Sequence, residues 1–351
     1  MELLPILDVL DSPKEGLWYS LVPAGSAPGV SVGHTCSFVP STDEGNGRII
    51  IIGGADPSGS FSHSHVIDLD NHQWVQADWT GLESRYEHCS FVPDCCPQSL
   101  WVFGGAQQTG NRNTIQKIQL SDSDSHWRNI QTNGDPPCPR TYHTSSACLG
   151  DKLYVFSGGE AGASPVADQK LHIFDTVSST WSQPQTQGRP PTARHGHIIV
   201  AVGSKIYIHG GVAGDKFYND MYTLDTVGML WKKVKAKGDL PPAVAAHSSV
   251  ALGNCVYIFG GMTPDGASNS MYKFVTDKCK WVLMRFEGDL PPNRLDHSMC
   301  LVPWKIRDAA SSSDESADCQ ANSNSVNLVF IYAGMDTQGV IHNDCVVTVV
   351  T

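Results

Sequence analysis

Hydrophobic residues in this chain occur in short runs of about five, separated by glycine, aspartate and proline, with no helical period. Residues 197–234 show the pattern most clearly. Apolar runs at 197–202 and 205–209 flank the pair Gly203-Ser204, which favours a tight hairpin. Further runs follow at 221–225 and 231–234. Runs of this length, rich in β-branched and aromatic residues, predict four short antiparallel strands.

This four-strand pattern repeats about every 50 residues, and each copy carries the same markers. A pair of glycines ends the second apolar run, and a tryptophan follows about 20 residues later. The pairs are Gly53-Gly54, Gly104-Gly105, Gly158-Gly159, Gly210-Gly211 and Gly260-Gly261, with a degenerate copy at Ala333-Gly334. The tryptophans are Trp74, Trp127, Trp181, Trp231 and Trp281. Such a period, with four strands per unit, predicts an all-β propeller.

The strand count predicts six blades and a closed ring. Five sets of four strands are complete, and the sixth has runs near His297, at 328–332 and at 345–350 but no tryptophan strand. Trp18, within residues 17–21, supplies that strand from the other terminus. We therefore expect a lead over residues 1–16 and a single propeller over 17–351, closed by an N-terminal strand that completes the last blade. Closure removes the exposed sheet edges.

One segment of the last blade does not fit the repeat. Residues 308–325 are rich in serine, aspartate and asparagine and contain almost no large apolar side chains. Because such a segment buries too little surface to order itself, we expect a disordered acidic insertion between the first and second strands of that blade.

Composition and charge narrow the partner class. The net charge is −11, from 35 acidic and 24 basic residues, which argues against binding to nucleic acid. No apolar stretch is long enough for a transmembrane segment, and the N-terminus lacks the pattern of a signal peptide. The eleven cysteines contain no Cys-x-x-Cys pair, which favours a cytosolic protein with reduced thiols. The partner class left by these exclusions is a protein, or a partner with a basic face.

The repeated polar residues are predicted to build the scaffold. Pairs such as His63 with His65, or His195 with His197, could chelate a metal from one face of a strand. However, histidines recur in an Arg-x-x-His context throughout the chain: Arg85 with His88, Arg140 with His143, Arg194 with His197 and Arg294 with His297. Residues used this regularly are expected to hold the blades. We therefore expect no catalytic residue, no metal and no cofactor.

These markers together resemble the kelch repeat: Arg-x-x-His, an apolar strand ending in Gly-Gly, a tyrosine in the third strand and the later tryptophan. The resemblance covers the chain from Trp18 to its end. Two units depart from it, with Ser31 and Val244 in place of the arginine, and Ala333 replaces the first glycine of the last unit.

A closer resemblance is to stand-alone kelch rings that act as effectors of Rab GTPases. It is carried by the lead into Leu17-Trp18-Tyr19, by residues 85–88, 101–106, 110–113 and 294–300, and by the late polar insertion. The resemblance implies a cytosolic protein that is recruited to late endosome membranes. It also implies binding to the GTP form of a Rab GTPase and a role in transport to the trans-Golgi network. We expect a monomer that reaches membranes only through its partners.

The binding site is expected on one end face of the ring. The loops after the glycine pairs, 55–63, 106–114, 160–168, 212–219 and 262–269, lie there with the blade-to-blade connections, and the turns between first and second strands lie on the other face. Variable loops on a rigid scaffold are where recognition usually occurs. The aromatic and cationic candidates in these loops are Phe61, Arg112, Lys216, Phe217 and Tyr218. The alternative is that Phe217 and Tyr218 only pack their loop.

Two other function classes remain open. A kelch substrate adaptor for a ubiquitin ligase, or a cytoskeletal interaction protein, would usually carry a large domain before the ring, and only about 16 residues precede Trp18. Kelch enzymes use a tyrosine and histidine copper site or a Glu-x-x-x-Asp-x-x-x-His iron motif, and no glutamate of this chain begins that motif. A metal-dependent enzyme is therefore the less favoured alternative.

Overall fold

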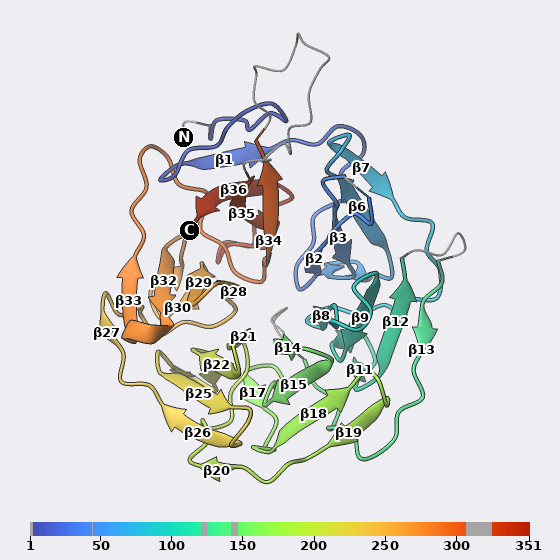
Figure 1. The fold of residues 1–351 in the computed structure, drawn as a ribbon, viewed down its shortest axis with the longest axis vertical. Coiled ribbons are helices and arrows are strands. Elements are labelled where there is room, and N and C mark those ends of the chain that lie inside the picture. The colour runs from blue at the N-terminus through green and yellow to red at the C-terminus, as the bar shows by residue number, and fades with distance from the viewer. Residues whose placement is uncertain (1–2, 44, 121–124, 142–146, 307–324) are drawn as a thin grey trace, which may run out of the picture.

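The computed structural model describes residues 3–43, 45–120, 125–141, 147–306 and 325–351. Six four-stranded antiparallel sheets surround a central axis like blades (Figure 1), which confirms the predicted six-bladed propeller. The first strand of each blade lies nearest the axis and the fourth lies at the rim. Blades are numbered 1 to 6 from the first complete repeat.

The blades have nearly uniform strand lengths. In order from axis to rim, blade 1 has β2 (Thr35–Val39), β3 (Arg48–Ile52), β6 (Ser64–Asp68) and β7 (Gln73–Gln76); blade 2 has β8 (Cys89–Phe91), β9 (Ser99–Phe103), β12 (Ile115–Gln119) and β13 (Arg128–Asn129); and blade 3 has β14 (Ala147–Leu149), β15 (Lys152–Phe156), β18 (Leu171–Asp175) and β19 (Thr180–Ser182). Blade 4 has β21 (Ile198–Val202), β22 (Lys205–His209), β25 (Met221–Asp225) and β26 (Leu230–Lys233); blade 5 has β28 (Ser248–Leu252), β29 (Cys255–Phe259), β32 (Met271–Val275) and β33 (Lys280–Leu283); and blade 6 has β34 (Ser298–Lys305), β35 (Ser325–Tyr332), β36 (Cys345–Val350) and β1 (Trp18–Leu21).

Two short parallel strands widen the rim. β20 (Gln187–Gly188) pairs with β26, and β27 (Lys237–Gly238) pairs with β33. The only helical element among the described residues is the 3₁₀ turn η1 (Thr276–Lys278). No helix in the described ranges is both long and apolar enough to span a bilayer.

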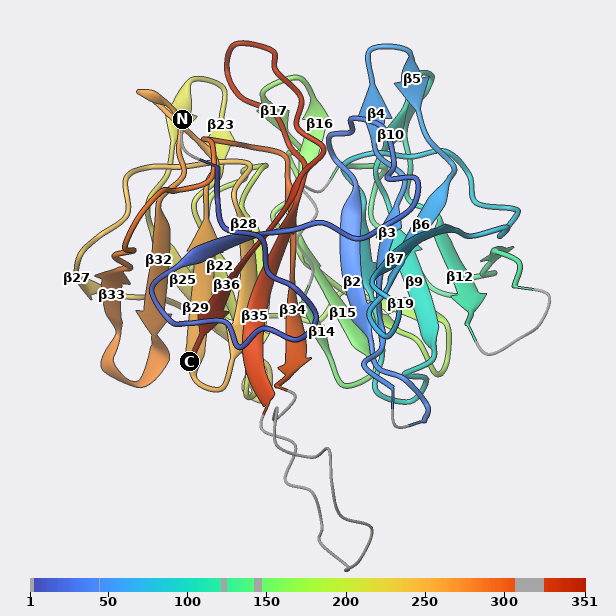
Figure 2. The ribbon, with the colours of Figure 1, turned by 90° about the horizontal axis from the view of Figure 1, so that it is seen from above.

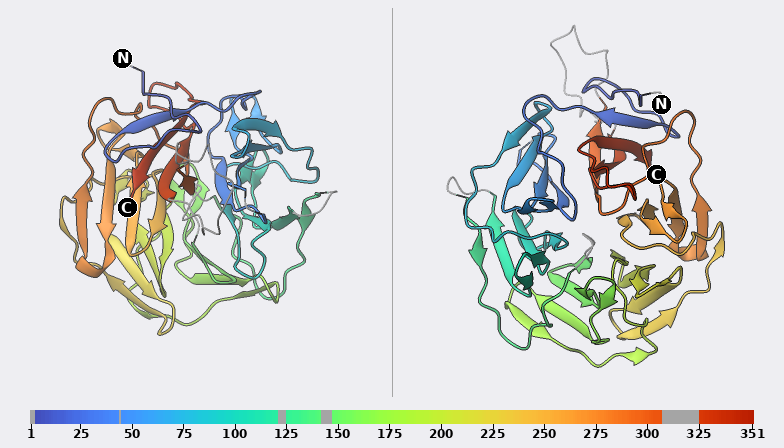
Figure 3. Two further views of the ribbon diagram at one scale, coloured as in Figure 1. Left: turned by 45° about the horizontal axis from the view of Figure 1, so that its top comes forward. Right: turned by 180° about the vertical axis from the view of Figure 1, so that it is seen from behind.

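Blade 6 closes the ring as the sequence predicts. β1 pairs antiparallel with β36, from Trp18 opposite Thr348 to Leu21 opposite Cys345. Figure 3 shows from two further sides that both chain ends lie beside this blade. The lead is packed rather than free, since the Leu7 amide donates to the Ser20 carbonyl at 2.9 Å and the Leu7 side chain is buried. The predicted insertion at 308–325 lies outside the described residues except for Ser325, which begins β35.

The repeated tryptophans act as wedges between blades. Each packs against the residue that ends the second strand of the preceding blade. Ring centroids lie 5.0–5.7 Å apart in five such pairs: Trp18–Phe259, Trp74–Tyr332, Trp181–Phe103, Trp231–Phe156 and Trp281–His209. Trp127 shares a hydrophobic cluster with Ile52, which has the same position in blade 1. The core is therefore a series of interfaces around the ring, which explains why the tryptophan recurs once per repeat.

The glycine pairs lie in close contact with other parts of the chain. A Cβ on Gly210 would lie 2.5 Å from the carbonyl oxygen of Val244 in the connection to blade 5, and one on Gly211 would lie 2.9 Å from the Cβ of His197 in its own blade. Both glycines also have positive φ, 70° and 98°. Glycine is required because it combines this backbone conformation with the absence of a side chain.

The structure corrects the register of the third pair by one residue. In blades 1 to 5 the amide of the second residue of the pair donates to a carbonyl of the connection to the next blade, and in blade 3 the donor to Arg194 is Gly158, at 3.0 Å. Ser157 therefore holds the first position, with φ of 57°, and Gly159 lies one residue beyond the pair. The exception has a physical reason: the Ser157 hydroxyl donates to the Arg194 carbonyl at 2.7 Å and accepts from its amide at 2.8 Å.

Candidate partner-binding face

A β-hairpin or tight loop follows each glycine pair, and all six rise on one end face of the ring. Figure 2 shows the labelled hairpin strands along its upper side, opposite the side where β34 ends and β35 begins. The five hairpins are β4 (Ala55–Asp56) with β5 (Gly59–Ser60), β10 (Ala106–Gln107) with β11 (Gly110–Asn111), β16 (Gly159–Ala161) with β17 (Ser164–Pro165), β23 (Val212–Ala213) with β24 (Lys216–Phe217), and β30 (Met262–Thr263) with β31 (Gly266–Ala267). In blade 6 a bridge between Met335 and Ile341 takes their place. We call this surface the hairpin face.

One residue has the same position in every hairpin. Its amide donates to the carbonyl of the second glycine of the same blade at 2.8–2.9 Å, which fixes how the loop returns to the third strand. The six residues are Phe61, Arg112, Val166, Tyr218, Ser268 and His342. Three of the five predicted binding residues, Phe61, Arg112 and Tyr218, therefore occupy equivalent places in blades 1, 2 and 4. Residue type alone does not reveal this equivalence, but the sequence carries it, because each of these three residues stands seven positions after the second glycine of its pair.

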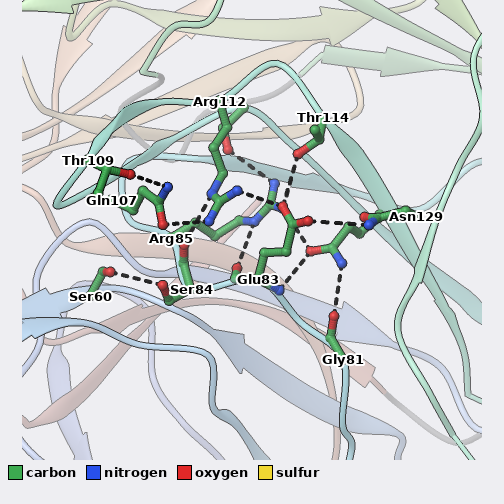
Figure 4. A network of polar contacts seen from close by, with 12 residues as sticks. Ser60, Gly81, Glu83, Ser84, Arg85, Gln107, Thr109, Arg112, Thr114 and Asn129 are labelled. Carbon is green, nitrogen blue, oxygen red and sulfur yellow. Dashed lines mark hydrogen bonds and ion pairs between the residues drawn. The ribbon is translucent and has the colours of Figure 1, made fainter.

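Arg112 belongs to a dense polar network in blade 2 (Figure 4). Its guanidinium donates to the Glu83 carboxylate and to the Gln107 side chain, both at 2.7 Å. The same carboxylate lies 3.5 Å from the fully buried guanidinium of Arg85, which also donates to the Gln116 side chain at 2.7 Å. The Arg112 side chain is only 16% exposed. Its first role is therefore to share Glu83 with Arg85, and a partner would meet a guanidinium whose orientation is already fixed.

Burial, followed by the nearby Arg112 guanidinium, lowers the pKa of Arg85 to about 10, against the raising effect of Glu83. Arg85 therefore remains charged at neutral pH. This explains why carboxylate and amide oxygens surround it, because a buried cation needs hydrogen-bonded partners.

Tyr218 also contacts a repeat arginine. The Arg194 guanidinium lies 4.0 Å from the centre of the Tyr218 ring, and the Lys216 ammonium lies 5.2 Å from it on the same hairpin. Both distances suit cation–π attraction. Tyr218 and Phe217 are half-buried and Lys216 is exposed. Tyr218 thus packs against the scaffold, while Lys216 presents its charge to solvent. A role of Phe217 and Tyr218 in partner binding stays a prediction.

The five predicted residues do not form one cluster. Phe61 and Arg112 lie in neighbouring blades, whereas Lys216, Phe217 and Tyr218 share the hairpin of blade 4, two blades beyond Arg112. A partner contacting all of them would have to cover about half of the ring.

The hairpin face is acidic. The segments 55–63, 106–114, 160–168, 212–219, 262–269 and 335–342 hold six carboxylates and two cations. The carboxylates are Asp56, Glu160, Asp168, Asp215, Asp265 and Asp336, and the cations are Arg112 and Lys216. Asp168 lies 3.3 Å from the buried Arg140, and Arg112 is paired with Glu83, so the charges left for a partner are mainly negative. Such a face attracts a partner with basic side chains.

The described residues contain no metal-binding geometry of three ligands. No group of three or more histidine, cysteine, aspartate or glutamate side chains is arranged to hold a metal ion within the part of the chain that the structure describes. The ring centroids of His63 and His65 are 6.5 Å apart.

Comparison with known proteins agrees with the repeat. A family model described as the KLHDC2/KLHL20/DRC7 Kelch-repeats domain matches residues 33–261, and the Kelch motif model matches residues 243–285. Three full-length relatives carry the same name, Rab9 effector protein with kelch motifs. The relative from Danio rerio is 62% identical and covers 100% of both chains; that from Xenopus laevis is 58% identical over 99% of this chain and 100% of its own; and that from Homo sapiens is 53% identical over 100% of both.

The six-bladed ring, its glycine pairs and its tryptophan wedges agree with these matches over the whole chain. The chain therefore belongs to the kelch-repeat family, within the group named Rab9 effector protein with kelch motifs.

Proposed function

We propose that this chain is a non-catalytic scaffold that binds a Rab9-type GTPase in its GTP form. The observation that carries the proposal is the match to relatives named Rab9 effector over the full length of both chains. A match of this extent includes the hairpins and connections that make up the surface, as well as the glycines and tryptophans of the ring.

The hairpin face is the proposed contact surface. Each hairpin is anchored through a backbone hydrogen bond to its own glycine pair, so the loops are held rigidly before a partner arrives. Preorganised loops lose little conformational entropy on binding. Their acidic character favours a partner with a basic patch, and Phe61 and Phe217 supply half-buried aromatic surface between the charges.

Bound in this way, the chain would be a cytoplasmic monomer that reaches late endosome membranes through the membrane-anchored GTPase. Its role would be to support transport from endosomes to the trans-Golgi network. This part of the proposal follows from the resemblance to Rab effectors and needs no membrane contact by the ring itself.

The test uses two matched double variants on opposite faces. Asp215→Asn/Phe217→Ala removes a negative charge and an apolar group from the hairpin of blade 4, and leaves Lys216 and Tyr218 in place. Asp94→Asn/Val227→Ala removes the same kinds of group from turns on the opposite face, where Asp94 is exposed and Val227 is 84% exposed.

Purified full-length chain is captured on Rab9 loaded with a GTP analogue or with GDP. The proposal expects capture by the GTP-analogue form only, at least tenfold weaker capture of the hairpin variant, and unchanged capture of the control variant. Equal capture by both nucleotide forms would reject the Rab effector function. Normal capture of a folded hairpin variant would reject this part of the face.

A further inference from the structure

One blade lacks the buried arginine of the repeat, and a cavity remains in its place. In blades 2, 3, 4 and 6 the arginine is completely buried and its guanidinium donates to the carbonyl at the first position of the glycine pair, at 3.0–3.1 Å. Its Nε donates to the carbonyl two residues before it, at 3.0–3.3 Å. Blade 1 has Ser31 at this position, and a serine cannot reach either acceptor.

The cavity of blade 1 has a volume of about 410 Å³, and its lining includes Asp56 and Phe61 of the hairpin face. This volume is within the range of about 300–1,000 Å³ that is usual for ligand sites. Its walls include Ser31, Gly29 and Gly53. The carbonyls of Gly29 and Gly53 are the equivalents of the two arginine acceptors in the other blades. The acceptors of the repeat are therefore retained in blade 1, while the donor is missing.

Two histidines hold the side-chain positions that surround the arginine elsewhere. His65 pairs with Ile51 as Gln116 pairs with Val102, so His65 corresponds to Gln116, an acceptor for Arg85. In blade 4 the residue equivalent to His65 is Tyr222, which pairs with Ile208. His63 therefore corresponds to Asp220, two residues before Tyr222, and Asp220 lies 2.6 Å from the Arg194 guanidinium. Both histidines line the cavity.

Burial, with a smaller effect of the neighbouring His63, lowers the pKa of His65. His65 is therefore neutral at physiological pH and has a ring nitrogen that can accept a hydrogen bond.

The cavity also has polar groups without internal partners. Across the described ranges, the hydroxyls of Ser31 and Tyr332 have no hydrogen-bond partner, although the two residues are only 5% and 0% exposed. Both residues line the cavity. Buried hydroxyls are normally hydrogen-bonded, and an unpaired one is costly. Asp56 supplies a carboxylate at the same cavity, and Phe61 and Val30 supply apolar surface.

Blade 5 also lacks the arginine, but there an apolar side chain fills the position. Val244 stands at the equivalent position and is 4% exposed, so an apolar side chain occupies the place of the arginine. Blade 1 combines the shorter serine with histidines, a carboxylate and an open cavity, which is the arrangement of a site that receives its cation from outside.

We propose that the cavity of blade 1 binds an arginine side chain of a partner protein, which takes the place filled by the chain's own arginine in four other blades. A guanidinium is favoured over an ammonium because the carbonyls and side-chain acceptors converge from different sides, which suits a planar fork of donors. The proposal does not depend on which protein supplies the arginine.

The probe is Nα-acetyl-arginine N-methylamide, titrated into the full chain while the ring-proton resonances of His63 and His65 are followed by NMR. The proposal expects saturable shifts of both rings. Nα-acetyl-lysine N-methylamide should bind at least tenfold more weakly. Absence of saturation with the arginine probe, or equal binding of the lysine probe, would overturn the proposal.

Variants then locate the site. Ser31→Arg should fill the cavity from within and weaken probe binding at least tenfold. Val177→Arg adds the same charge at a position that is 70% exposed in blade 3 and should leave binding unchanged. If Ser31→Arg does not fold, His65→Leu decides the question, because it removes the acceptor equivalent to Gln116 and should weaken binding to the same extent. Binding that survives in either folded cavity variant would overturn the assignment.

Discussion

The buried arginines make a quantitative prediction, and Arg194 is the best place to test it. Its guanidinium contacts the Asp220 carboxylate at 2.6 Å, the Gly210 carbonyl at 3.0 Å and the Thr192 hydroxyl at 3.2 Å, and it lies against the Tyr218 ring. Arg194→Met keeps the length of the side chain and removes every one of these donors. The Gly210 carbonyl and the Asp220 carboxylate are then left without their charged partner.

Removing one partner of a buried ion pair costs about 3–5 kcal/mol. Asp220 is 18% exposed on its side chain and can regain some hydration, so the lower end applies. We expect Arg194→Met to lower the free energy of unfolding by about 3 kcal/mol. Adding Asp220→Asn removes the orphaned charge and should restore about 1 kcal/mol of this loss.

The assay is equilibrium unfolding in urea, followed by tryptophan fluorescence, which reports on the blade interfaces directly. Arg189→Met is the matched control, because Arg189 is exposed in the same connection and its loss should change stability by less than about 0.5 kcal/mol. A loss of stability below about 1 kcal/mol for Arg194→Met, or one equal to that of the control, would refute the role of the buried arginines in stabilising the blades.

Three further predictions concern the repeat. Gly211→Ala, where a Cβ would lie 2.9 Å from another Cβ, should cost more than about 3 kcal/mol in a urea melt. Gly214→Ala, also at positive φ but with no atom within 4 Å, should cost about 1 kcal/mol. Trp231→Ala should cost about 3–5 kcal/mol, since it removes the wedge against Phe156, and a loss below 1 kcal/mol would exclude that role. Burial lowers the pKa of His209 to about 4 from the usual 6.5, so the unfolded chain binds a proton between these values and the folded chain does not. Its contribution to stability should therefore fall as the pH drops from 6.5 towards 4, by as much as about 3 kcal/mol, and His209→Gln should flatten this slope.

Much of the fold can be predicted from the sequence because each blade carries residues that mark where its strands begin and end. Strand runs, glycine pairs and tryptophans recur with one period, and Trp18 at one terminus completes the set missing at the other. The third repeat shows the limit of this reasoning. The adjacent glycines at 158–159 suggest the wrong register, since the structural pair is Ser157-Gly158. Serine can replace glycine there because its hydroxyl forms hydrogen bonds with the backbone of Arg194, 37 residues further along the chain.

The candidate site was less predictable, for a similar reason. The sequence favours Arg112 and Tyr218 by residue type, but their contacts with Glu83 and Arg194 depend on how neighbouring loops meet. Ser31 is visible in the sequence only as a departure from the pattern. Its consequence, a cavity between blades 6 and 1, requires Tyr332 from a strand 301 residues further along the chain.

The proposed contact surface can be tested most directly by hydrogen–deuterium exchange of the full chain, alone and with Rab9 loaded with a GTP analogue. The account predicts slower exchange in the hairpins at residues 55–60, 106–111 and 212–217, and no change in the opposite turn at 203–204. The GDP-loaded GTPase should cause no protection at either place. Protection confined to the turns of the opposite face, with unchanged hairpins, would contradict the central claim.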